Sequence, residues 1–356
     1  MGSDSGVYTE ESGFERVDDV SSSDVSASAD HLVIMVHGIL GSTDDWKFAA
    51  NQFAKALKDK VIVHCSERNM NKLTLDGVDV MGERLAEEVV DLISKRPGLK
   101  KISFIAHSVG GLVARYTIGM LYRTVEKSQV NLADGAHGVN AKGTICGLKA
   151  MNFITVATPH LGSRGNKQVP FLFGLTVVEK VASLIIHLIF RRTGRHLFLT
   201  DNDAQKPPLL QRMVEDCELQ FMSALEAFER RVAYSNVGHD HIVGWRTSSI
   251  RRNSELPKWD KSVNEKYPHI VYEEYTKGST AESCSHDTIE ENNNDMLEEK
   301  LVVGLTRLSW ERVDVSFHSS KQRFAAHSTI QVKDTFMHSE VMNCSSEFLT
   351  RSEYTS

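Results

Sequence analysis

Short apolar runs rich in β-branched residues alternate with amphipathic helical stretches from residue 31 onward, and this alternation limits the folds open to the chain. The first apolar runs are residues 31–36, 60–65 and 101–107, and amphipathic stretches such as 79–98 separate them. Helices between consecutive strands act as crossover connections, which give parallel strands and cover both faces of the sheet. The pattern therefore predicts an α/β fold with a mostly parallel, doubly wound sheet over about residues 31–333.

Four segments depart from this alternation. Residues 1–30 are polar, have no apolar signal-peptide core, and are predicted to be a disordered tail. Residues 169–199 are strongly apolar and end in a basic cluster, which is typical of a lid-like insertion. Residues 276–299 are predicted to be an acidic surface loop, and residues 334–356 a polar tail without helical periodicity. No run of 18 apolar residues occurs, so the sequence predicts no membrane-spanning helix.

Charge and cysteine usage exclude some classes of function. The formal net charge is −6, which argues against nucleic-acid binding, since nucleic-acid-binding proteins usually carry a basic patch or stripe. The five cysteines are scattered without paired metal-ligand spacing, so we expect neither a disulfide framework nor a cysteine metal site. A cytoplasmic location, with or without peripheral contact with membranes or lipid droplets, is the expectation.

A serine lies on an abrupt turn between a predicted strand and a predicted helix. Residues 106–110 read AHSVG, close to the G-x-S-x-G pattern of an α/β-hydrolase nucleophile, with alanine in place of the first glycine. Small residues are needed beside such a serine because a larger side chain would collide with the neighbouring backbone. The position between strand and helix favours Ser108 as a nucleophile over an ordinary turn serine.

A serine hydroxyl needs a base and an acid that orients the base, and in this fold they follow the serine in the order acid, then histidine. Asp240 comes just after the predicted strand at 230–237, and His327 lies in the loop beyond the predicted strand at 310–317. We therefore predict a catalytic triad of Ser108, Asp240 and His327.

Other residues remain candidates for the acid and the base. His318 falls at the strand end itself, and His338 lies further along the chain. Asp201 and Asp203 are the next candidates for the acid.

Acyl transfer also needs hydrogen-bond donors for the oxyanion that forms at the carbonyl oxygen. These are ordinarily the backbone N–H after the nucleophile and one in the loop after an early strand. The glycine-rich loop VHGILGS follows the first predicted strand directly. The backbone N–H groups of Ile39 and Val109 are therefore predicted to form the oxyanion hole.

Several longer motifs resemble one family of plants and fungi, the lipase-like serine esterases of the α/β-hydrolase fold. The motifs are MVHGILGSTDDW, LTLDGVDVMGERLAEEV, ISFIAHSVGGLVARY, FITVATPHLGS, HLFLTD, NVGHDHIVGWRTSSIR and AAHSTIQVK. The resemblance implies hydrolysis of lipid or other carboxylic esters without a cofactor or metal, through Ser108, Asp240 and His327. The resemblance implies a glycine-containing turn and a closing apolar helix after IQVK. In this chain the residues after IQVK are polar and lack both features.

We expect a serine hydrolase that acts on acylglycerols or phospholipids through an acyl-enzyme. The apolar stretch 169–190 would admit an acyl chain as a lid, while Arg191, Arg192 and Arg195 would meet anionic headgroups. A packing helix is the alternative for this stretch. A catalytically silent scaffold that binds a partner or ligand, and a lipid acyltransferase, are the alternative functions. The sequence does not indicate an oligomeric state.

Overall fold

The computed structural model describes residues 29–57, 60–124, 142–163, 190–203, 205–258, 267, 269–278 and 293–331. The four segments that depart from the strand–helix alternation therefore lie largely outside the described residues. What is described of them is residues 29–30, 190–199, 276–278 and 293–299.

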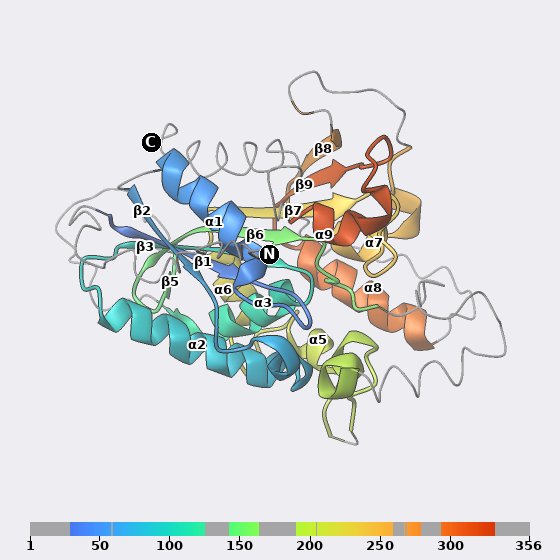
Figure 1. Ribbon diagram of the computed structural model, residues 1–356. Helices are drawn as coiled ribbons and strands as arrows, with labels where there is room; N and C mark the ends of the chain where they lie inside the picture. The colour runs from blue at the N-terminus through green and yellow to red at the C-terminus, as the bar shows by residue number, and fades with distance from the viewer. Residues whose placement is uncertain are drawn as a thin grey trace, which may run out of the picture.

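Seven strands form the central sheet, in the order β2-β1-β3-β6-β7-β9-β8 (Figure 1). All neighbouring pairs are parallel except β8 and β9, which are antiparallel at one edge. The strands are β1 (His31–Val36), β2 (Val61–Cys65), β3 (Lys101–His107), β6 (Lys149–Val156), β7 (Arg230–Asn236), β8 (Ile270–Thr276) and β9 (Trp310–Val315). A small second sheet pairs β4 (Tyr122–Arg123) with β5 (Thr144–Ile145).

Helices connect these strands and flank the sheet. The α-helices are α1 (Asp44–Leu57), α2 (Val78–Ser94), α3 (Gly110–Leu121), α5 (Leu209–Arg212), α6 (Phe221–Glu226), α7 (Trp245–Ser248), α8 (Asn293–Thr306) and α9 (Ala326–Thr329). Residues 190–197 are helical as well. Short 3-10 helices are η2 (Asn71–Leu75), η5 (Asn253–Glu255) and η6 (Arg323–Ala325).

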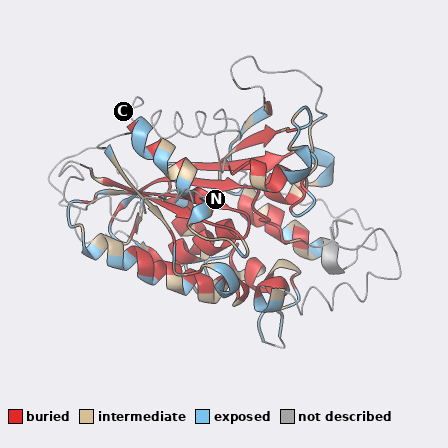
Figure 2. Cartoon of the chain, in the orientation of Figure 1, coloured by how far each residue is buried: buried red, intermediate tan, exposed pale blue. Residues whose placement is uncertain are grey.

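The apolar core lies on both faces of the sheet, because the central strands are apolar at consecutive positions. Along β1, Leu32, Ile34 and Val36 pack on the face covered by α2, α3 and α6, whereas Val33 and Met35 pack on the face covered by α1 and α9. Consecutive side chains of a strand point to opposite faces, so a continuous apolar run indicates burial on both sides. Figure 2 shows the inner strands buried and the outward faces of α1 and α2 exposed. The predicted α/β fold with a mostly parallel, doubly wound sheet is confirmed.

Two elements differ from the sequence-based expectation. Helix α8 begins inside the stretch 276–299 that we expected to be an acidic loop, because Leu301, Val302 and Leu305 recur at helical spacing and pack in the core. Strand β8 carries Glu273 and Glu274, and Ile270 is its one buried residue. It lies at the edge of the sheet and, among the described strands, forms backbone hydrogen bonds with β9 alone.

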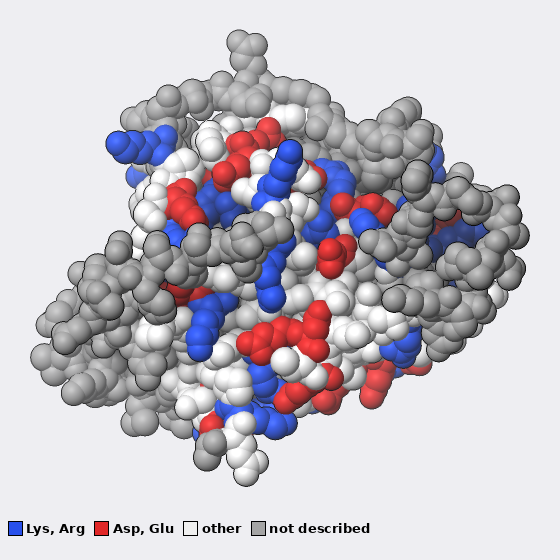
Figure 3. All heavy atoms as spheres, turned by 180° about the vertical axis from the view of Figure 1, so that it is seen from behind, with Lys and Arg blue, Asp and Glu red and all other residues white. Residues whose placement is uncertain are grey.

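No helix within the described residues is long and apolar enough to cross a membrane. On the described part of the face in Figure 3, acidic and basic side chains lie next to one another, and neither charge dominates the face. The carboxyl ends of the parallel strands meet at one edge of the sheet, where a doubly wound sheet usually carries its site.

Candidate active site

Ser108 occupies a strained backbone corner between β3 and α3. Its φ angle is +55°, a left-handed conformation that non-glycine residues seldom adopt, and its N–H donates to the carbonyl of Val156 over 2.9 Å. A Cβ on Gly110 would lie 2.5 Å from the carbonyl oxygen of His37, so this position requires glycine. Backbone strain of this kind is concentrated at functional sites. The corner therefore has the geometry of a nucleophile elbow.

The structure brings together the three side chains that the sequence analysis selected. The imidazole of His327 lies between the other two, with Nδ1 2.9 Å from Asp240 Oδ2 and Nε2 3.0 Å from Ser108 Oγ. Because Nδ1 faces a carboxylate, it carries the proton, which leaves Nε2 free to accept the serine O–H. All three residues are buried. This arrangement can remove the hydroxyl proton and hold the resulting imidazolium.

The carboxyl group of Asp240 is held by four hydrogen bonds. Oδ1 accepts from the backbone N–H groups of Ile242 (3.0 Å) and Val243 (2.8 Å), while Oδ2 accepts from Asn236 Nδ2 (2.8 Å) and from His327. Burial by itself would raise the pKa of Asp240. The hydrogen bond and charge of His327, with the donors from Val243 and Asn236, outweigh burial and leave the pKa below its ordinary value. The carboxylate is therefore ionised when it faces the imidazole.

The loop after β1 lies directly against the serine. A Cβ on Gly38 would lie 2.9 Å from Ser108 Cβ and 3.4 Å from its Oγ, so glycine permits this approach. Among the described residues, neither the N–H of Ile39 nor that of Val109 donates to a backbone carbonyl. The next residue of the loop, Leu40, donates its N–H to Thr74 Oγ1 over 2.8 Å, which fixes the loop on η2. Both predicted oxyanion donors thus remain available.

His107 has a structural role that the sequence analysis missed. Its Nε2–H donates to the backbone carbonyl of His327 over 2.7 Å, and the two rings lie 4.7 Å apart between centroids. The residue before the nucleophile therefore holds the turn that bears the base. Its position inside the AHSVG motif, directly before Ser108, is the sequence feature that could have indicated this role. The sequence analysis also missed Asn236, four residues before Asp240, which donates to the Asp240 carboxylate.

The alternative acids and bases that the structure describes have partners other than the proposed triad. His318 Nδ1 lies 3.3 Å from His239 Nε2 at the exposed rim, and His338 lies outside the described residues. Asp201 accepts from the backbone N–H of Leu209, and Asp203 accepts from the backbone of Gln205 and Lys206. No contact of these aspartates with His327 is found within the described chain.

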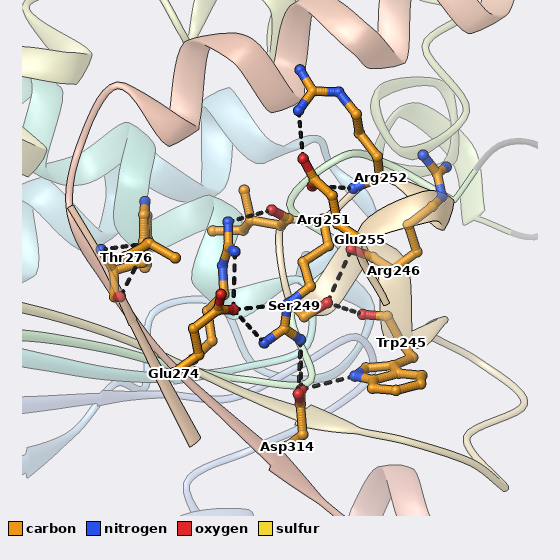
Figure 4. Close-up of polar contacts among 12 residues, drawn as sticks. Trp245, Arg246, Ser249, Arg251, Arg252, Glu255, Glu274, Thr276 and Asp314 are labelled. Carbon is orange, nitrogen blue, oxygen red and sulfur yellow. Dashed lines mark hydrogen bonds and ion pairs between the residues drawn. The ribbon is translucent and has the colours of Figure 1, made fainter. Parts of the chain in front are cut away.

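A buried ionic cluster anchors the segment that follows Asp240 (Figure 4). Arg251 donates through Nη1 to both oxygens of Asp314 (3.0 and 2.7 Å), and Trp245 Nε1 donates to Asp314 Oδ1 over 2.8 Å. Glu274 on β8 accepts from Arg251 Nη2 (3.0 Å) and from Arg312 Nη1 (3.3 Å). The cluster thereby joins the stretch after the acid to strands β8 and β9.

One group within the described residues could offer three ligand atoms to a metal ion. It consists of His64, Glu67 and Glu88, whose nearest donor atoms lie within 4.8 Å of one another. The Glu88 carboxylate already accepts from His64 Nε2 (2.7 Å), Ser66 Oγ (2.8 Å) and the N–H of Glu67 (2.9 Å). These hydrogen bonds account for the group without an ion.

Comparison with known proteins places the chain in a family. The family model described as "Putative serine esterase (DUF676)" matches residues 26–250. The chain is 27% identical over 234 residues to "Putative lipase C4A8.10" of Schizosaccharomyces pombe and 29% identical over 231 residues to "Putative lipase ROG1" of Saccharomyces cerevisiae. These alignments cover 63% and 62% of this chain but 26% and 28% of the two relatives. The chain thus spans about a quarter of the length of these relatives.

Two solved structures share the general arrangement at low similarity. Phospholipase PlaB from Legionella pneumophila, in complex with thio-NAD, is 16% identical with a TM-score of 0.35, covering 59% of this chain and 38% of that one. The propeptide form of lipase BlEst2 from Bacillus licheniformis is 14% identical with a TM-score of 0.36, covering 60% and 37%.

Proposed function

Because the chain belongs to the serine esterase family whose model matches residues 26–250, we propose that it is a serine hydrolase that cleaves carboxylic esters of lipids. One observation carries the proposal: the imidazole of His327 lies within hydrogen-bond distance of both Ser108 Oγ and Asp240 Oδ2. Nucleophile, base and orienting acid in mutual contact are the requirements of acyl transfer through a covalent intermediate.

In the proposed mechanism, Ser108 Oγ attacks the ester carbonyl while His327 Nε2 takes the hydroxyl proton. Asp240 holds the imidazole in the required tautomer and stabilises the imidazolium that forms. The N–H groups of Ile39 and Val109 donate to the oxyanion of the tetrahedral intermediate. His327 then protonates the departing alcohol, and a water molecule that gives its proton to His327 hydrolyses the acyl-enzyme.

The surroundings of the site favour a lipid over a small polar ester. Three large apolar side chains next to the site in the chain remain exposed: Leu40 (54%), Ile242 (48%) and Phe324 (67%). Leu40 follows Ile39, Ile242 comes two residues after Asp240, and Phe324 precedes His327 by three residues. A contiguous apolar patch is typical of contact with an apolar partner, and these three residues would contribute to one if they lie together beside the site. An acyl chain at a lipid surface fits this requirement.

A fluorophosphonate probe, which labels activated serines, tests the proposal. We expect the wild-type protein and the control variant Ser94→Ala to be labelled, because Ser94 is exposed and its hydroxyl donates to the carbonyl of Asp91 in its own helix. Ser108→Ala should be neither labelled nor able to hydrolyse a soluble short-chain ester or an emulsified long-chain ester. Labelling of Ser108→Ala, or no labelling of wild type, would contradict the triad. The second result would favour a catalytically silent scaffold.

A further inference from the structure

A cavity that is separate from the Ser108 site lies beside the first turn of α2. It has a volume of about 760 Å³, within the range of small-molecule sites. Its walls come from α2, the middle of α3, the helical residues 190–197 and the segment up to residue 218. The helical residues and α5 lie beside the N-terminal end of α2 (Figure 1). None of the residues that line this cavity belongs to the proposed triad or oxyanion hole.

The cavity has more positive charge than its own carboxylates neutralise. Five cationic side chains line it: Arg191, Arg192, Arg195, Lys206 and Arg212. Arg192 pairs with Asp79, while Lys206 (3.3 Å) and Arg212 (2.6 Å) share Glu218.

The five cations share the described part of the wall with four carboxylates, so the surplus is one positive charge. Among the described residues, the guanidinium groups of Arg191 and Arg195 have no ion-pair partner. Asp203, also in the wall, accepts from the backbone N–H groups of Gln205 and Lys206 (2.8 Å each). A ligand group with two or more negative oxygens could pair with both of these guanidinium groups.

A buried histidine presents a further donor to the same cavity. His196 is only 3% exposed, and its Nδ1 accepts the backbone N–H of Val78 over 3.0 Å. The proton of the neutral ring must therefore be on Nε2, and burial lowers the pKa of His196, which favours the neutral form. The nearest carboxylate oxygen, Asp201 Oδ2, is 3.8 Å from Nε2, too far for a hydrogen bond. Among the described residues this Nε2–H has no acceptor at hydrogen-bond distance, so it is available to a ligand in the cavity.

An acceptor without a partner lies beside this donor. Asp201 Oδ2 accepts the N–H of Leu209 over 2.7 Å, but Oδ1 is buried and has no hydrogen-bond partner within the described part of the chain. As far as the structure describes its surroundings, the cavity therefore offers three features to a ligand: the unpaired guanidinium groups of Arg191 and Arg195, the N–H donor of His196, and a carboxylate oxygen of Asp201 that lacks a donor. A phosphate group attached to a hydroxyl-bearing compound can pair with all three.

We propose that this cavity binds a phosphorylated polyol, with the phosphate on Arg191, Arg195 and the Nε2–H of His196 and a hydroxyl group on Asp201. Guanidinium groups match phosphate geometry with paired hydrogen bonds. The same chemistry occurs in the headgroup of a phosphoinositide and in a free inositol phosphate. The site does not depend on the proposed esterase activity.

Calorimetric titration with inositol 1-phosphate and co-sedimentation with phosphatidylcholine vesicles, with or without phosphatidylinositol 4-phosphate, test the proposal. The double variant R191A/R195A should bind at least about tenfold more weakly, because it loses two charge-assisted contacts. The matched control K95A/R123A removes the same charge at exposed positions outside the cavity and should bind like wild type. Binding in the vesicle assay alone identifies a lipid headgroup as the source, and binding of inositol 1-phosphate identifies a soluble ligand.

The carboxylate is tested separately by Asp201→Asn. This variant should weaken binding of inositol 1-phosphate but not of inorganic phosphate, which has no polyol hydroxyl to donate. Absence of binding in both assays, or equal binding by wild type and R191A/R195A, would overturn the proposal. Equal affinity of wild type and Asp201→Asn for inositol 1-phosphate would remove the hydroxyl contact. None of these measurements uses ester hydrolysis, so they can fail independently of the proposed function.

Discussion

At the scale of single residues, the site depends on which ring nitrogen of His327 carries the proton. Asp240 decides this through a 2.9 Å contact with Nδ1, and Asn236 and two backbone N–H groups hold the carboxylate in place. An amide in place of the carboxylate could donate to Nδ1 and so favour the tautomer that carries its proton on Nε2. The imidazole would then no longer accept the hydroxyl proton of Ser108.

Asp240→Asn should therefore keep the fold and lose most of the rate. We expect kcat on a soluble ester to fall about a thousandfold or more. The measurement is steady-state hydrolysis together with circular dichroism melting, to separate lost catalysis from lost structure. An equally folded variant that retains most of its activity would move the acid to another residue.

The sequence predicted the side chains of this site better than their supports. Ser108, Asp240 and His327 were identifiable because each follows an apolar strand in the chain order of the fold, and the structure brings them into contact. Their catalytic roles stay predictions. His107 was not assigned a role, because its partner is a backbone carbonyl 220 positions away, and no local pattern encodes such a contact.

At the scale of elements, strand β9 and the segment after Asp240 are joined by a buried ion pair in addition to apolar packing. Arg251 is 1% exposed, and Asp314 is fully buried. Burial raises the pKa of Asp314 even though Arg251 lies beside it, so the cost of removing the carboxylate from water is only partly offset. A buried pair of this kind adds little net stability but penalises any arrangement that separates its members. It therefore fixes the position of the segment that begins at the acid.

Adjacent arginines allow a matched test of this cluster. Arg251→Met leaves Asp314 buried without its cation and should lower the free energy of unfolding by about 3–5 kcal/mol. Arg252 pairs with Glu255 and Glu299 at the surface, so Arg252→Met should cost less than about 1 kcal/mol. Urea unfolding measures both. Similar losses for the two variants would show that the cluster has no special role.

At the scale of the whole molecule, the family resemblance and the fold class predicted from sequence are confirmed. Strands such as β1 and β3 are nearly continuous apolar runs, whose pattern is clear without an alignment. Strand β8 was missed because its glutamates and partly exposed side chains resemble a polar loop. β8 pairs with the edge that β9 offers in the folded sheet, and the sequence of residues 270–276 does not encode that edge.

Buried neutral histidines make the stability of the molecule depend on pH. Burial, with the charge of Arg115, lowers the pKa of His160 well below 6.5, the value of the unfolded chain. The stability contribution is complete above about pH 6.5 and is lost as the pH falls, because only the unfolded state then takes up a proton. His160 alone should contribute a decrease of about 1.4 kcal/mol per pH unit below this range.

Urea unfolding of wild type and His160→Gln between pH 8 and pH 5 measures this effect. The variant should lose stability less steeply than wild type in the acidic part of the range, whatever its stability at pH 8. Parallel curves for the two proteins would show that His160 is not the group that takes up the proton. His37 and His196, whose pKa values burial also lowers, contribute to the slope that remains.

The hydrogen bond from His107 to the carbonyl of His327 joins a corner made early in the chain to a turn that follows β9. During synthesis, the hydroxyl of Ser108 leaves the ribosome long before the imidazole that would take its proton. Under the proposed mechanism, a growing chain cannot activate Ser108 until β9 has docked and brought the turn that bears His327 into place. Incomplete copies of the chain would then have no esterase activity.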